Sequence, residues 1–348
     1  MVKKVVIVGG GFGGLQAALV LGRSKDVQVC ILDRRNHFLF QPLLYQVATA
    51  SLSPSDIGTP IRQVVARNRN TSVHLEKAVS VDLARRLVVT DSDAHGYDYL
   101  ILACGSSHSY FGRDDWEDLA PGLKTVEQAL EIRRRLLLAF ETAEKEEDEE
   151  RKKKLVTFVV IGGGPTGVEL AGAVTELARG IVSEEFRNIR PEEVRVVLLH
   201  GGDRLLPSFD PGLSEKARIA LVDKGVEVRM GQRAEDLGPL GVMVGGELIE
   251  TSTVLWAAGV RPSGLNGTLG VPLDKEGRVA VEQDLSIPGH PEVFAIGDQA
   301  RFETPEGPLP GLAPVAMQQG RTAARNILLQ LGESRGSLSV TWTRGPWP

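Results

Sequence analysis

The sequence has few side chains suited to thiol redox chemistry. Among its 348 residues there are two cysteines, Cys30 and Cys104, each within an apolar run, and they form no C-x-x-C pair. A dithiol relay needs a thiolate with a resolving partner nearby, so this spacing excludes such a relay through the protein. Both cysteines are predicted to be small core residues, and we assign no metal site.

A long hydrophobic run and an excess of positive charge are also absent. No stretch approaches the ~20 apolar residues of a membrane-spanning helix. Residues 1–4 look like the start of a signal peptide, but glycines between 9 and 14 interrupt any hydrophobic segment behind them, which predicts a cytoplasmic chain. The net charge of −5 gives no reason to expect nucleic acid as a partner, and the length predicts roughly two globular domains.

Glycine, by contrast, is placed in an informative pattern, because two glycine-rich turns each follow an apolar, β-branched run. The turns are Gly9-Gly10-Gly11-Phe12-Gly13-Gly14 and Gly162-Gly163-Gly164-Pro165-Thr166-Gly167. In a G-x-G-x-x-G turn, the first glycine makes the turn, the second lets the backbone approach a pyrophosphate, and the third lets the next helix pack closely on the strand. The free N–H groups at the start of that helix face the anion. Two such turns predict two bound dinucleotides and electron transfer between them.

The end of the second strand differs between the two units. After the first turn, the apolar strand 27–32 ends in Asp33, whose carboxylate is expected to accept hydrogen bonds from ribose hydroxyls. After the second turn, the strand 194–199 ends in His200 instead of an acid. A neutral histidine still hydrogen-bonds a ribose, and a cationic one tolerates a 2′-phosphate. NADH and NADPH are both open for the second site, and so is the interpretation that His200 only ends a strand.

The rest of the sequence predicts the elements around these turns. Residues 71–90 alternate apolar and polar side chains, which is typical of antiparallel strands. Residues 125–154 predict one long helix, whose charged end from 144 onward is expected to be a solvated face. The apolar face of this helix is predicted to contain Leu130, Leu136, Leu137 and Phe140. Residues 314–331 predict the last helix, and residues 332–348 show no convincing periodicity.

The order of the motifs resembles that in the pyridine nucleotide-disulfide oxidoreductase-like flavoproteins, which have two dinucleotide-binding domains. Residues 99–105 and 253–259 look like that family's two linker strands, and residues 295–298 look like its Gly-Asp motif. The resemblance implies an α/β fold with two Rossmann-like domains, the NAD(P)H domain being inserted in the FAD domain. The expected domains are 1–115 and 259–331 for FAD and 116–258 for NAD(P)H, with 332–348 as an irregular tail.

Within this family, the sequence is most similar to the type II NADH dehydrogenases, which are NADH:quinone oxidoreductases that pump no protons. Residues 40–48 are similar to that branch's loop beside the flavin, 162–172 to its NADH loop, and 312–320 to its quinone motif Ala-Gln-x-x-x-Gln. Pro314 replaces the first glutamine of the quinone motif and cannot donate its hydrogen bond. The branch continues into amphipathic helices that bind the membrane surface, whereas this sequence ends at Pro348, so we expect impaired docking or a truncated product.

The resemblance implies FAD at the first site, NADH at the second with NADPH left open, and a membrane quinone as the electron acceptor. Besides the two turns, it assigns cofactor binding to Asp33, Arg34, Gln41, Ala103, Gly105, His200, Gly259, Gly297 and Asp298. Hydride is expected to pass from NADH to FAD, and the flavin then reduces the quinone. Peripheral contact with the inner face of the cell membrane and a homodimer are left open.

Glu169, Gln318 and Gln319 are the side chains to which the resemblance gives a part in catalysis. It places Glu169 against the nicotinamide, where a carboxylate fixes the ribose or relays a proton towards the quinone. The alternative is that Glu169, in the first turn of its helix, only interacts with the helix dipole. Gln318 and Gln319 are expected to approach the flavin, although ordinary polar helix residues have the same pattern.

Two further functions stay open. One is a soluble flavin reductase with an acceptor other than quinone. The other is a flavoprotein that senses NADH with little turnover and uses the acidic residues 144–150 as an interaction surface. A sulfide:quinone oxidoreductase would need redox cysteines near the flavin, and two isolated cysteines argue against it.

Overall fold

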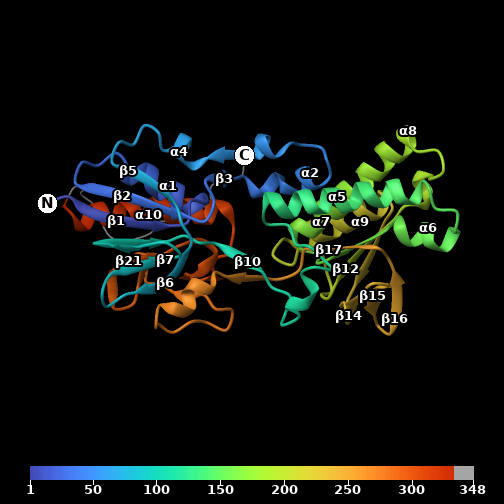
Figure 1. The fold of residues 1–348 in the computed structure, drawn as a ribbon. Helices are drawn as coiled ribbons and strands as arrows, with labels where there is room; N and C mark the ends of the chain where they lie inside the picture. The colour runs from blue at the N-terminus through green and yellow to red at the C-terminus, as the bar shows by residue number, and fades with distance from the viewer. Residues whose placement is uncertain (333–348) are drawn as a thin grey trace. The chain divides into compact units, whose positions relative to one another are not determined.

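The structure is a computed structural model that describes residues 1–332, so the expected tail beyond residue 332 lies outside the described residues. Its contacts group into two compact units. Unit 1 contains residues 1–39, 58–107 and those from 261 onward, and unit 2 contains residues 40–57 and 108–260. Each unit has a separate, mainly parallel sheet, and helices pack against that sheet (Figure 1). Most of unit 2 is therefore an insertion in the chain of unit 1.

A six-stranded sheet forms the centre of unit 1. Its strands are β1 (Lys3–Val8), β2 (Val27–Asp33), β5 (Thr71–Leu75), β9 (Tyr99–Leu102), β20 (Ser286–Ile287) and β21 (His290–Ala295). Their order is β20-β21-β9-β1-β2-β5. β20 is antiparallel to β21, and the other neighbours are parallel. β1 therefore lies in the interior of the sheet, and its carboxyl end leads directly into the first glycine turn.

Strand β5 corrects the prediction of antiparallel strands over residues 71–90. It pairs parallel to β2, with Leu32 opposite His74. The antiparallel pairing begins one strand later, in a separate sheet of β6 (Ala78–Asp82), β7 (Leu87–Thr90) and β8 (Ala94–Gly96). Alternating side chains indicate that one face of a strand is covered, but they do not reveal the direction of its partner.

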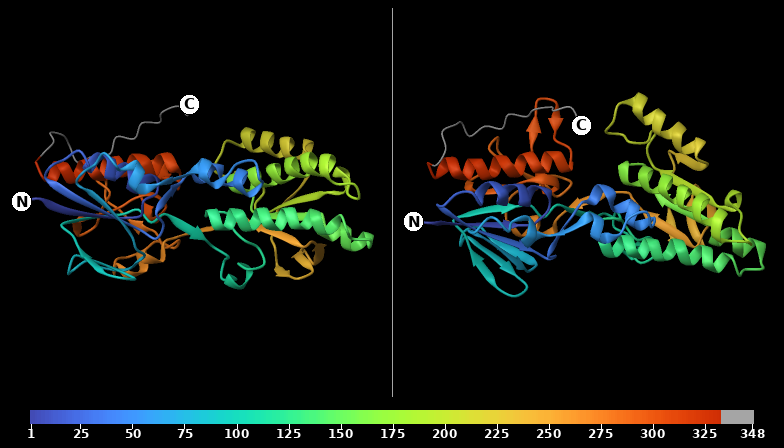
Figure 2. Two further views of the ribbon diagram at one scale, coloured as in Figure 1. Left: turned by 45° about the horizontal axis from the view of Figure 1, so that its top comes forward. Right: turned by 90° about the horizontal axis from the view of Figure 1, so that it is seen from above.

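Different layers cover the two faces of the unit 1 sheet. Because side chains alternate along a strand, Val5 and Ile7 point into one core and Val6 and Val8 into another. The first core is closed by α1 (Phe12–Leu21) and α10 (Ala313–Gln330), which lie side by side (Figure 1, Figure 2). The second core includes side chains of the β6-β7-β8 sheet. The last helix therefore packs against the helix that follows the first glycine turn.

Unit 2 repeats this plan with a four-stranded parallel sheet. Its strands are β11 (Thr157–Ile161), β12 (Arg195–His200), β13 (Val226–Met230) and β17 (Thr253–Trp256), in the order β13-β12-β11-β17. The longer helices are α5 (Val126–Ala143), α7 (Pro165–Leu177) and α9 (Pro211–Asp223), and a second, antiparallel sheet contains β14 (Asp236–Gly238), β15 (Gly241–Val244) and β16 (Glu247–Glu250). β11 leads into the second glycine turn, and α7 follows it, as β1 and α1 do in unit 1.

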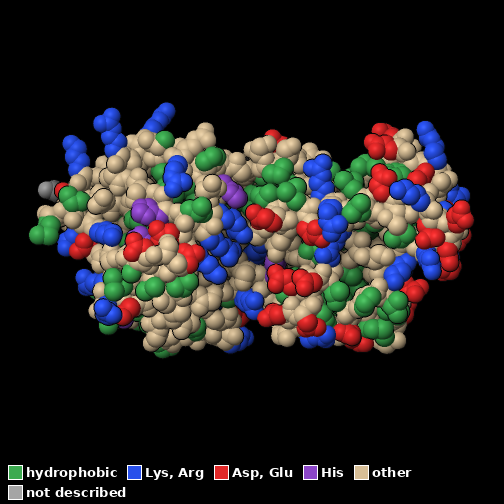
Figure 3. Space-filling model, viewed as in Figure 1, with side chains coloured by type: hydrophobic (Ala, Val, Ile, Leu, Met, Phe, Trp, Pro, Cys, Tyr) green, Lys and Arg blue, Asp and Glu red, His purple; other side chains and the backbone are tan. Residues whose placement is uncertain are grey.

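The charged segment after α5 does not continue that helix. A separate helix, α6 (Glu149–Leu155), begins at Asp148, whose carboxylate accepts hydrogen bonds from the N–H groups of Glu150 and Arg151. The prediction of one helix over 125–154 is therefore wrong, because Asp148 is an N-cap that starts a new helix. No residue of α6 is buried, and side chains of both charges cover this end of unit 2 (Figure 3).

The apolar face of α5 differs in part from the predicted one. Leu136 and Phe140 are buried as expected, whereas Leu130 is exposed. The buried residues of α5 are Ala129, Ile132, Leu136, Ala139, Phe140 and Ala143. Apart from the adjacent pair Ala139 and Phe140, they follow one another at spacings of three or four residues, and Leu130 lies outside that stripe.

The segment 40–57 groups with unit 2, although the residues on both sides of it belong to unit 1. It contains η1 (Gln41–Leu43), α2 (Leu44–Ala48) and α3 (Pro54–Ile57). α2 packs against α5 and α7, and its Leu44 and Val47 are buried. The segment that resembles a loop beside the flavin is therefore held by the second unit.

Short elements complete both units. They are β3 (His37–Leu39), β4 (Gly58–Pro60), α4 (Ile61–Val64), β10 (Ser106–His108), η2 (Asp114–Trp116), η3 (Ala178–Val182), α8 (Ser183–Glu185), η4 (Pro191–Glu193), β18 (Val260–Pro262), η5 (Gly264–Thr268), β19 (Val279–Ala280), η6 (Gly297–Gln299), β22 (Ala300–Arg301), β23 (Glu303–Thr304) and β24 (Gly307–Pro308). Among residues 1–332, no helix combines the length and the apolar composition needed to cross a membrane.

Candidate functional site

The first glycine turn is closed against the protein at its ends and open at its middle. Gly9 has a φ of +106°, and a side chain there would collide with the backbone of Ala103. A side chain on Gly14 would collide with the carbonyl oxygen of Gly9, so α1 approaches β1 as closely as only glycine allows. At Gly11, no described atom beyond its chain neighbours lies within 4 Å of where a Cβ would be. This open position at the start of α1 fits a pyrophosphate.

The second glycine turn has the same geometry in unit 2. Gly162 has a φ of +119°, and a side chain there would collide with the backbone of Ala257. A side chain on Gly167 would collide with the carbonyl oxygen of Gly162. Around the Cβ position of Gly164, no described atom other than its chain neighbours lies within 4 Å. Both turns therefore fit a dinucleotide phosphate by the same three-glycine arrangement.

Asp33 ends β2 next to the first turn, as the sequence predicts. Its Oδ2 accepts a hydrogen bond from the backbone N–H of Gly10 over 2.6 Å, and its Oδ1 accepts one from Arg35 N–H over 2.7 Å. A carboxylate oxygen has further lone pairs, so the group keeps capacity to accept ribose hydroxyls. Arg34 follows it and is exposed, and Phe12 in the turn meets Phe38 edge-to-face, with ring centroids 5.1 Å apart.

His200 takes the corresponding position beside the second turn. Its Nδ1 accepts a hydrogen bond from the backbone N–H of Gly163 over 3.1 Å. In the neutral ring this geometry assigns the proton to Nε2, which is then a donor for a ribose or phosphate oxygen. Arg233 was not predicted from the sequence; its side chain lies against Gly201, 2.7 Å from where a Cβ of that residue would be. Gly201 follows His200 directly, so the Arg233 guanidinium is a cation close to the position where a 2′-phosphate would lie. The spacing in the sequence does not predict that Arg233 and Gly201 are neighbours.

The Gly-Asp motif lies at the end of β21 in unit 1. Gly297 has a φ of +70°, and its N–H donates to Oε1 of Gln319 over 2.6 Å. The Oδ2 of Asp298 accepts a hydrogen bond from Oγ of Ser106 over 2.6 Å. Gln319 is only 2% exposed. Gln319 is therefore a positioning residue, because its hydrogen bond holds the backbone of Gly297 next to Asp298. The neighbouring Gln318 is half-buried.

A buried pair of amides holds the end of β9, and the sequence analysis missed it. Gln299 is fully buried, and its Oε1 accepts a hydrogen bond from Cys104 N–H over 2.5 Å. Its Nε2 donates to Oδ1 of Asn266 over 2.9 Å. These bonds fix the chain between Ala103 and Gly105, which is where the first linker leaves the sheet. The signal for them in the sequence is weak, because a buried glutamine is not distinguishable from an exposed one by spacing.

The thiol of Cys104 is not an activated nucleophile. The residue keeps some accessible surface, but burial of the sulfur raises the pKa of its thiol to about 12. Burial also raises the pKa of the Cys30 thiol. Reactive cysteines have lowered pKa values, so the surroundings of Cys30 and Cys104 do not favour the thiolate form of either side chain.

Glu169 lies in α7, shortly after the second glycine turn, but it is not in the first turn of the helix as predicted, because α7 begins at Pro165. This weakens the alternative that Glu169 only interacts with the helix dipole. The Glu169 side chain reaches solvent, but desolvation by the protein around the carboxyl raises its pKa to about 7. Tyr45 on α2 has a raised pKa, caused first by burial and then by the charge of Glu169. The segment 40–57 therefore contributes an aromatic hydroxyl to the surroundings of Glu169.

The predicted site residues fall into two groups. Unit 1 brings together the first turn with Asp33, Arg34, Ala103, Gly105, Gly297, Asp298, Gln318 and Gln319. Unit 2 brings together the second turn, including Pro165 and Thr166, with Glu169, His200, Gln41 and Gly259. Gln41 donates to the backbone oxygen of Lys124 over 3.2 Å, and Gly259 has a φ of +70°. Gln41, which the resemblance assigned to the flavin, thus belongs to unit 2 and not to unit 1.

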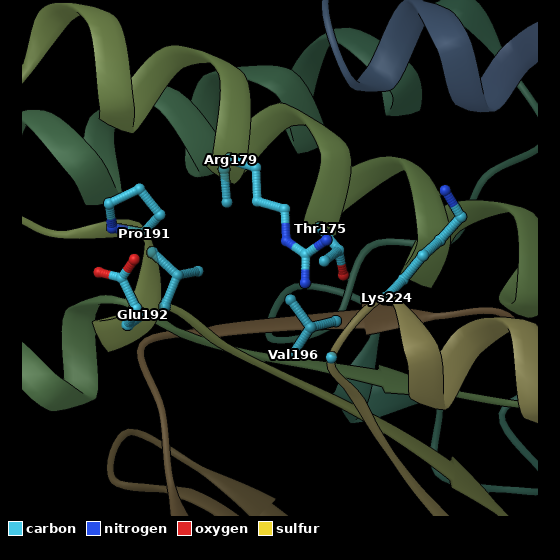
Figure 4. Close-up of a pocket in the computed structure, with 9 residues that line it drawn as sticks. Thr175, Arg179, Pro191, Glu192, Val196 and Lys224 are labelled. Carbon is cyan, nitrogen blue, oxygen red and sulfur yellow. The ribbon is translucent and has the colours of Figure 1, made fainter.

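A cavity of about 160 Å³ lies elsewhere in unit 2 (Figure 4). Arg179, Glu192 and Lys224 line it, together with Val196 near the start of β12. In open parallel sheets, nucleotides bind at the carboxyl ends of the strands. This cavity lies by the amino ends of β12 and β13, so it is distinct from the second glycine turn.

Comparisons with known proteins agree with the two-turn arrangement. The family described as pyridine nucleotide-disulphide oxidoreductase matches residues 3–320. The type II NADH:quinone oxidoreductase Ndh of Mycobacterium tuberculosis is 42% identical over 341 residues, which cover 94% of this chain and 73% of that protein. NdhA, a type II NADH:quinone oxidoreductase of the same organism, is 41% identical over 338 residues, covering 93% of this chain and 71% of that protein.

A solved structure has the same fold. NDH2 from Plasmodium falciparum, determined in complex with NADH, matches with a TM-score of 0.85 at 18% identity, and the match covers 95% of this chain and 83% of that one. At this identity the likeness concerns the fold alone. Together with the family match, it confirms the predicted α/β fold with two Rossmann-like domains.

Proposed function

This chain belongs to the pyridine nucleotide-disulphide oxidoreductase family and, within it, to the type II NADH:quinone oxidoreductases, and from that premise we propose how its two sites share the reaction. It is an oxidoreductase that takes a hydride from NADH and passes electrons to a quinone without pumping protons. One observation carries this function: two glycine turns of equal geometry occur in a chain 42% identical to such an enzyme.

Unit 1 would hold FAD. Gly9, Gly11 and Gly14 form the cradle for the pyrophosphate, and Asp33 accepts the hydroxyls of the adenosine ribose. Asp298 would accept the ribityl hydroxyls, and the Gln319 side chain supports this position through its bond to Gly297. When bound, FAD would supply the redox chemistry that links a two-electron hydride donor to the quinone acceptor. The residues of this chain supply the binding, the orientation and the exclusion of water.

Unit 2 would hold the nicotinamide dinucleotide. Gly162, Gly164 and Gly167 form its phosphate cradle, and His200 replaces the ribose-binding acid. A neutral imidazole neither repels a 2′-phosphate nor binds two ribose hydroxyls as a carboxylate does. NADH as the substrate is supported by the relatives, which are NADH:quinone oxidoreductases. The Arg233 side chain near Gly201 is a cation that would let the same site accept NADPH as well.

Glu169 is proposed to hold a proton near the reacting ring. Reduction of a quinone to a quinol consumes two protons, so a group that is protonated near neutral pH is useful there. The raised pKa of about 7 gives the Glu169 carboxyl that property, and Tyr45 lies close enough to be affected by its charge. Gln318 is proposed as a polar contact of the quinone, since Pro314 provides no donor at the other motif position.

The acceptor implies where the protein works. Quinones of respiratory chains are dissolved in the membrane, so we propose that the enzyme works at the inner face of the cell membrane as a peripheral protein of the respiratory chain. The relatives named above are quinone reductases, which supports this acceptor.

Anaerobic stopped-flow measurements on the purified protein test this function. NADH is expected to bleach the flavin absorbance rapidly, and a short-chain quinone is expected to restore it faster than oxygen or ferricyanide does. Recovery with the water-soluble acceptors alone would support a soluble flavin reductase instead. Slow recovery with every acceptor would support an NADH sensor, and absence of flavin from the purified protein would contradict the assignment of unit 1.

A further inference from the structure

Three side chains of types that can ligate a metal ion meet in unit 1, and none of them belongs to a glycine turn. Cys30 lies on β2, His74 on β5 and His95 on β8, and one ligand atom from each lies within 4.8 Å of the others. The two imidazole rings stand edge-to-face with centroids 5.5 Å apart. Cys30 and His95 are buried, whereas the His74 side chain is 41% exposed, so an ion can reach the group from solvent.

The strand registers explain why these side chains meet. Cys30 lies opposite Ser72, and the next residue on the same face of β2, Leu32, lies opposite His74. Cys30 and His74 therefore point from neighbouring strands towards the same side of the sheet. The β6-β7-β8 sheet packs on that side and places His95 over them.

Glu76 ties the two histidines together. Its Oε2 lies 2.7 Å from Nε2 of His95, and its Oε1 lies 3.3 Å from Nδ1 of His74. Thr90 Oγ1 donates to Glu76 Oε2 over 2.7 Å, and the Glu76 side chain is only 14% exposed. A carboxylate that bonds one nitrogen of a histidine orients the ring and raises the basicity of the other nitrogen, as in many zinc sites.

We propose that Cys30, His74 and His95 form a binding site for a divalent cation of the Zn²⁺ class, with Glu76 as the carboxylate that orients the rings. Thiolate and imidazole together favour zinc over magnesium or calcium, which prefer oxygen ligands. Zinc bonds of roughly 2.0–2.3 Å require the three ligand atoms to lie closer together than the 4.8 Å limit within which they meet here, so binding would draw these side chains inward. Binding forms a zinc–sulfur bond, breaks the S–H bond of Cys30 and releases that proton to water, so no electrons are transferred.

The position of this site suggests what the ion does. The backbone N–H of Glu76 donates to the carbonyl oxygen of Asp33 over 2.9 Å. The ion would thus connect β2, β5 and β8 close to Asp33, the residue whose carboxylate is proposed to hold the FAD ribose. Bound zinc is expected to raise the thermal midpoint of unit 1 and to slow the loss of FAD, without entering electron transfer.

Metal binding to the untagged holoprotein tests the proposal. After treatment with a chelator, competition with a chromophoric chelator is expected to show one Zn²⁺ per chain with a Kd below about 1 µM. Cys30→Ser and His74→Ala are each expected to weaken binding by at least about tenfold. His290→Ala, on β21 of the same unit, is the matched control and is expected to keep the wild-type affinity.

Cobalt provides a second measurement that does not depend on enzyme activity. Co²⁺ bound by the wild-type protein is expected to show a sulfur-to-metal charge-transfer absorption that Cys30→Ser lacks. If Cys30→Ser does not fold, judged by far-UV circular dichroism and flavin content, His74→Ala at the half-exposed position carries the test. The proposal is overturned if the wild-type protein binds zinc no more tightly than about 10 µM, if both variants bind as the wild type does, or if the cobalt form shows no thiolate absorption.

Discussion

Nδ1 of His200 accepts a hydrogen bond from the backbone N–H of Gly163 over 3.1 Å. In unit 1 the same bond is made by the corresponding glycine, Gly10, whose N–H donates to Oδ2 of Asp33. His200 therefore occupies, at the end of β12, the acceptor position that Asp33 occupies at the end of β2. An imidazole at this position lacks the negative charge that excludes a 2′-phosphate.

We predict that His200→Asp makes the enzyme more selective for NADH. The carboxylate would still accept the Gly163 N–H and would accept ribose hydroxyls, while repelling the 2′-phosphate of NADPH. The ratio of kcat/KM for NADH over NADPH is expected to rise at least about fivefold, which corresponds to roughly 1 kcal/mol. Arg233→Ala is expected to reduce kcat/KM for NADPH with little change for NADH. An unchanged ratio in both variants would mean that the ribose lies elsewhere.

The geometry of the turns could be predicted from the sequence, whereas this acceptor bond could not. Gly9 and Gly162 were identified from their place after an apolar strand, because a tight turn at that point leaves few other choices. That Nδ1 of His200 faces Gly163 depends on a rotamer, which spacing does not determine. For the same reason, the hydrogen bond that Oε1 of Gln319 accepts from Gly297 N–H could not be predicted from the sequence.

Contacts between distant strands were the least predictable. Cys30, His74 and His95 come from β2, β5 and β8, and their meeting depends on the parallel register of β5, which the alternation of residues 71–90 did not reveal. The break before α6 was missed because a charged run favours a helix, while the capping role of Asp148 is set by local geometry. The resemblance to type II NADH dehydrogenases was confirmed because it rests on several motifs in order.

Glu169→Gln is predicted to remove a pH dependence from quinone reduction. Desolvation raises the pKa of the Glu169 carboxyl to about 7, so the wild-type group holds a proton below that pH and loses it above. The rate of flavin reoxidation by quinone is therefore expected to fall as the pH rises through about 7, and the variant is expected to show a flat profile. Glu176→Gln, on the exposed surface of the same helix, is the control that should keep the wild-type profile.

The same shift predicts a change in stability with a definite sign. The pKa of Glu169 is raised in the folded protein, so ionising it there is less favourable than in the unfolded chain. Folding stability contributed by the protonated form is lost as the pH rises towards and through about 7. The thermal midpoint of Glu169→Gln relative to the wild type is therefore expected to increase between about pH 5 and pH 8. A difference that stays constant over this range would contradict the raised pKa.

Gln319→Ala is predicted to destabilise unit 1 and to loosen FAD. The Gln319 side chain is 2% exposed, and its removal leaves the N–H of Gly297 without its acceptor, next to Asp298. Gly297 is half-buried, so leaving its N–H without an acceptor is expected to cost about 1 kcal/mol or somewhat more, which urea unfolding would measure. Gln318→Ala, at the half-buried neighbouring position, should cost less than about 1 kcal/mol. Equal losses in both variants would show that the bond to Gly297 is not what matters.

Gly164→Ala is predicted to separate folding from cofactor binding in unit 2. The Cβ would enter space in which no described atom beyond the chain neighbours lies within 4 Å, and the φ of −77° suits alanine, so the fold should tolerate the change. The methyl group would occupy the place where the backbone approaches the pyrophosphate, so the KM for NADH is expected to rise by about tenfold or more.

Gly180→Ala is the matched control for this variant. Its Cβ also meets no described atom within 4 Å, but it lies in η3, away from the turn. The variant Gly164→Ala should keep the wild-type thermal midpoint and FAD content, since unit 1 is untouched. A loss of FAD together with a normal KM for NADH would assign the two dinucleotides to the opposite units.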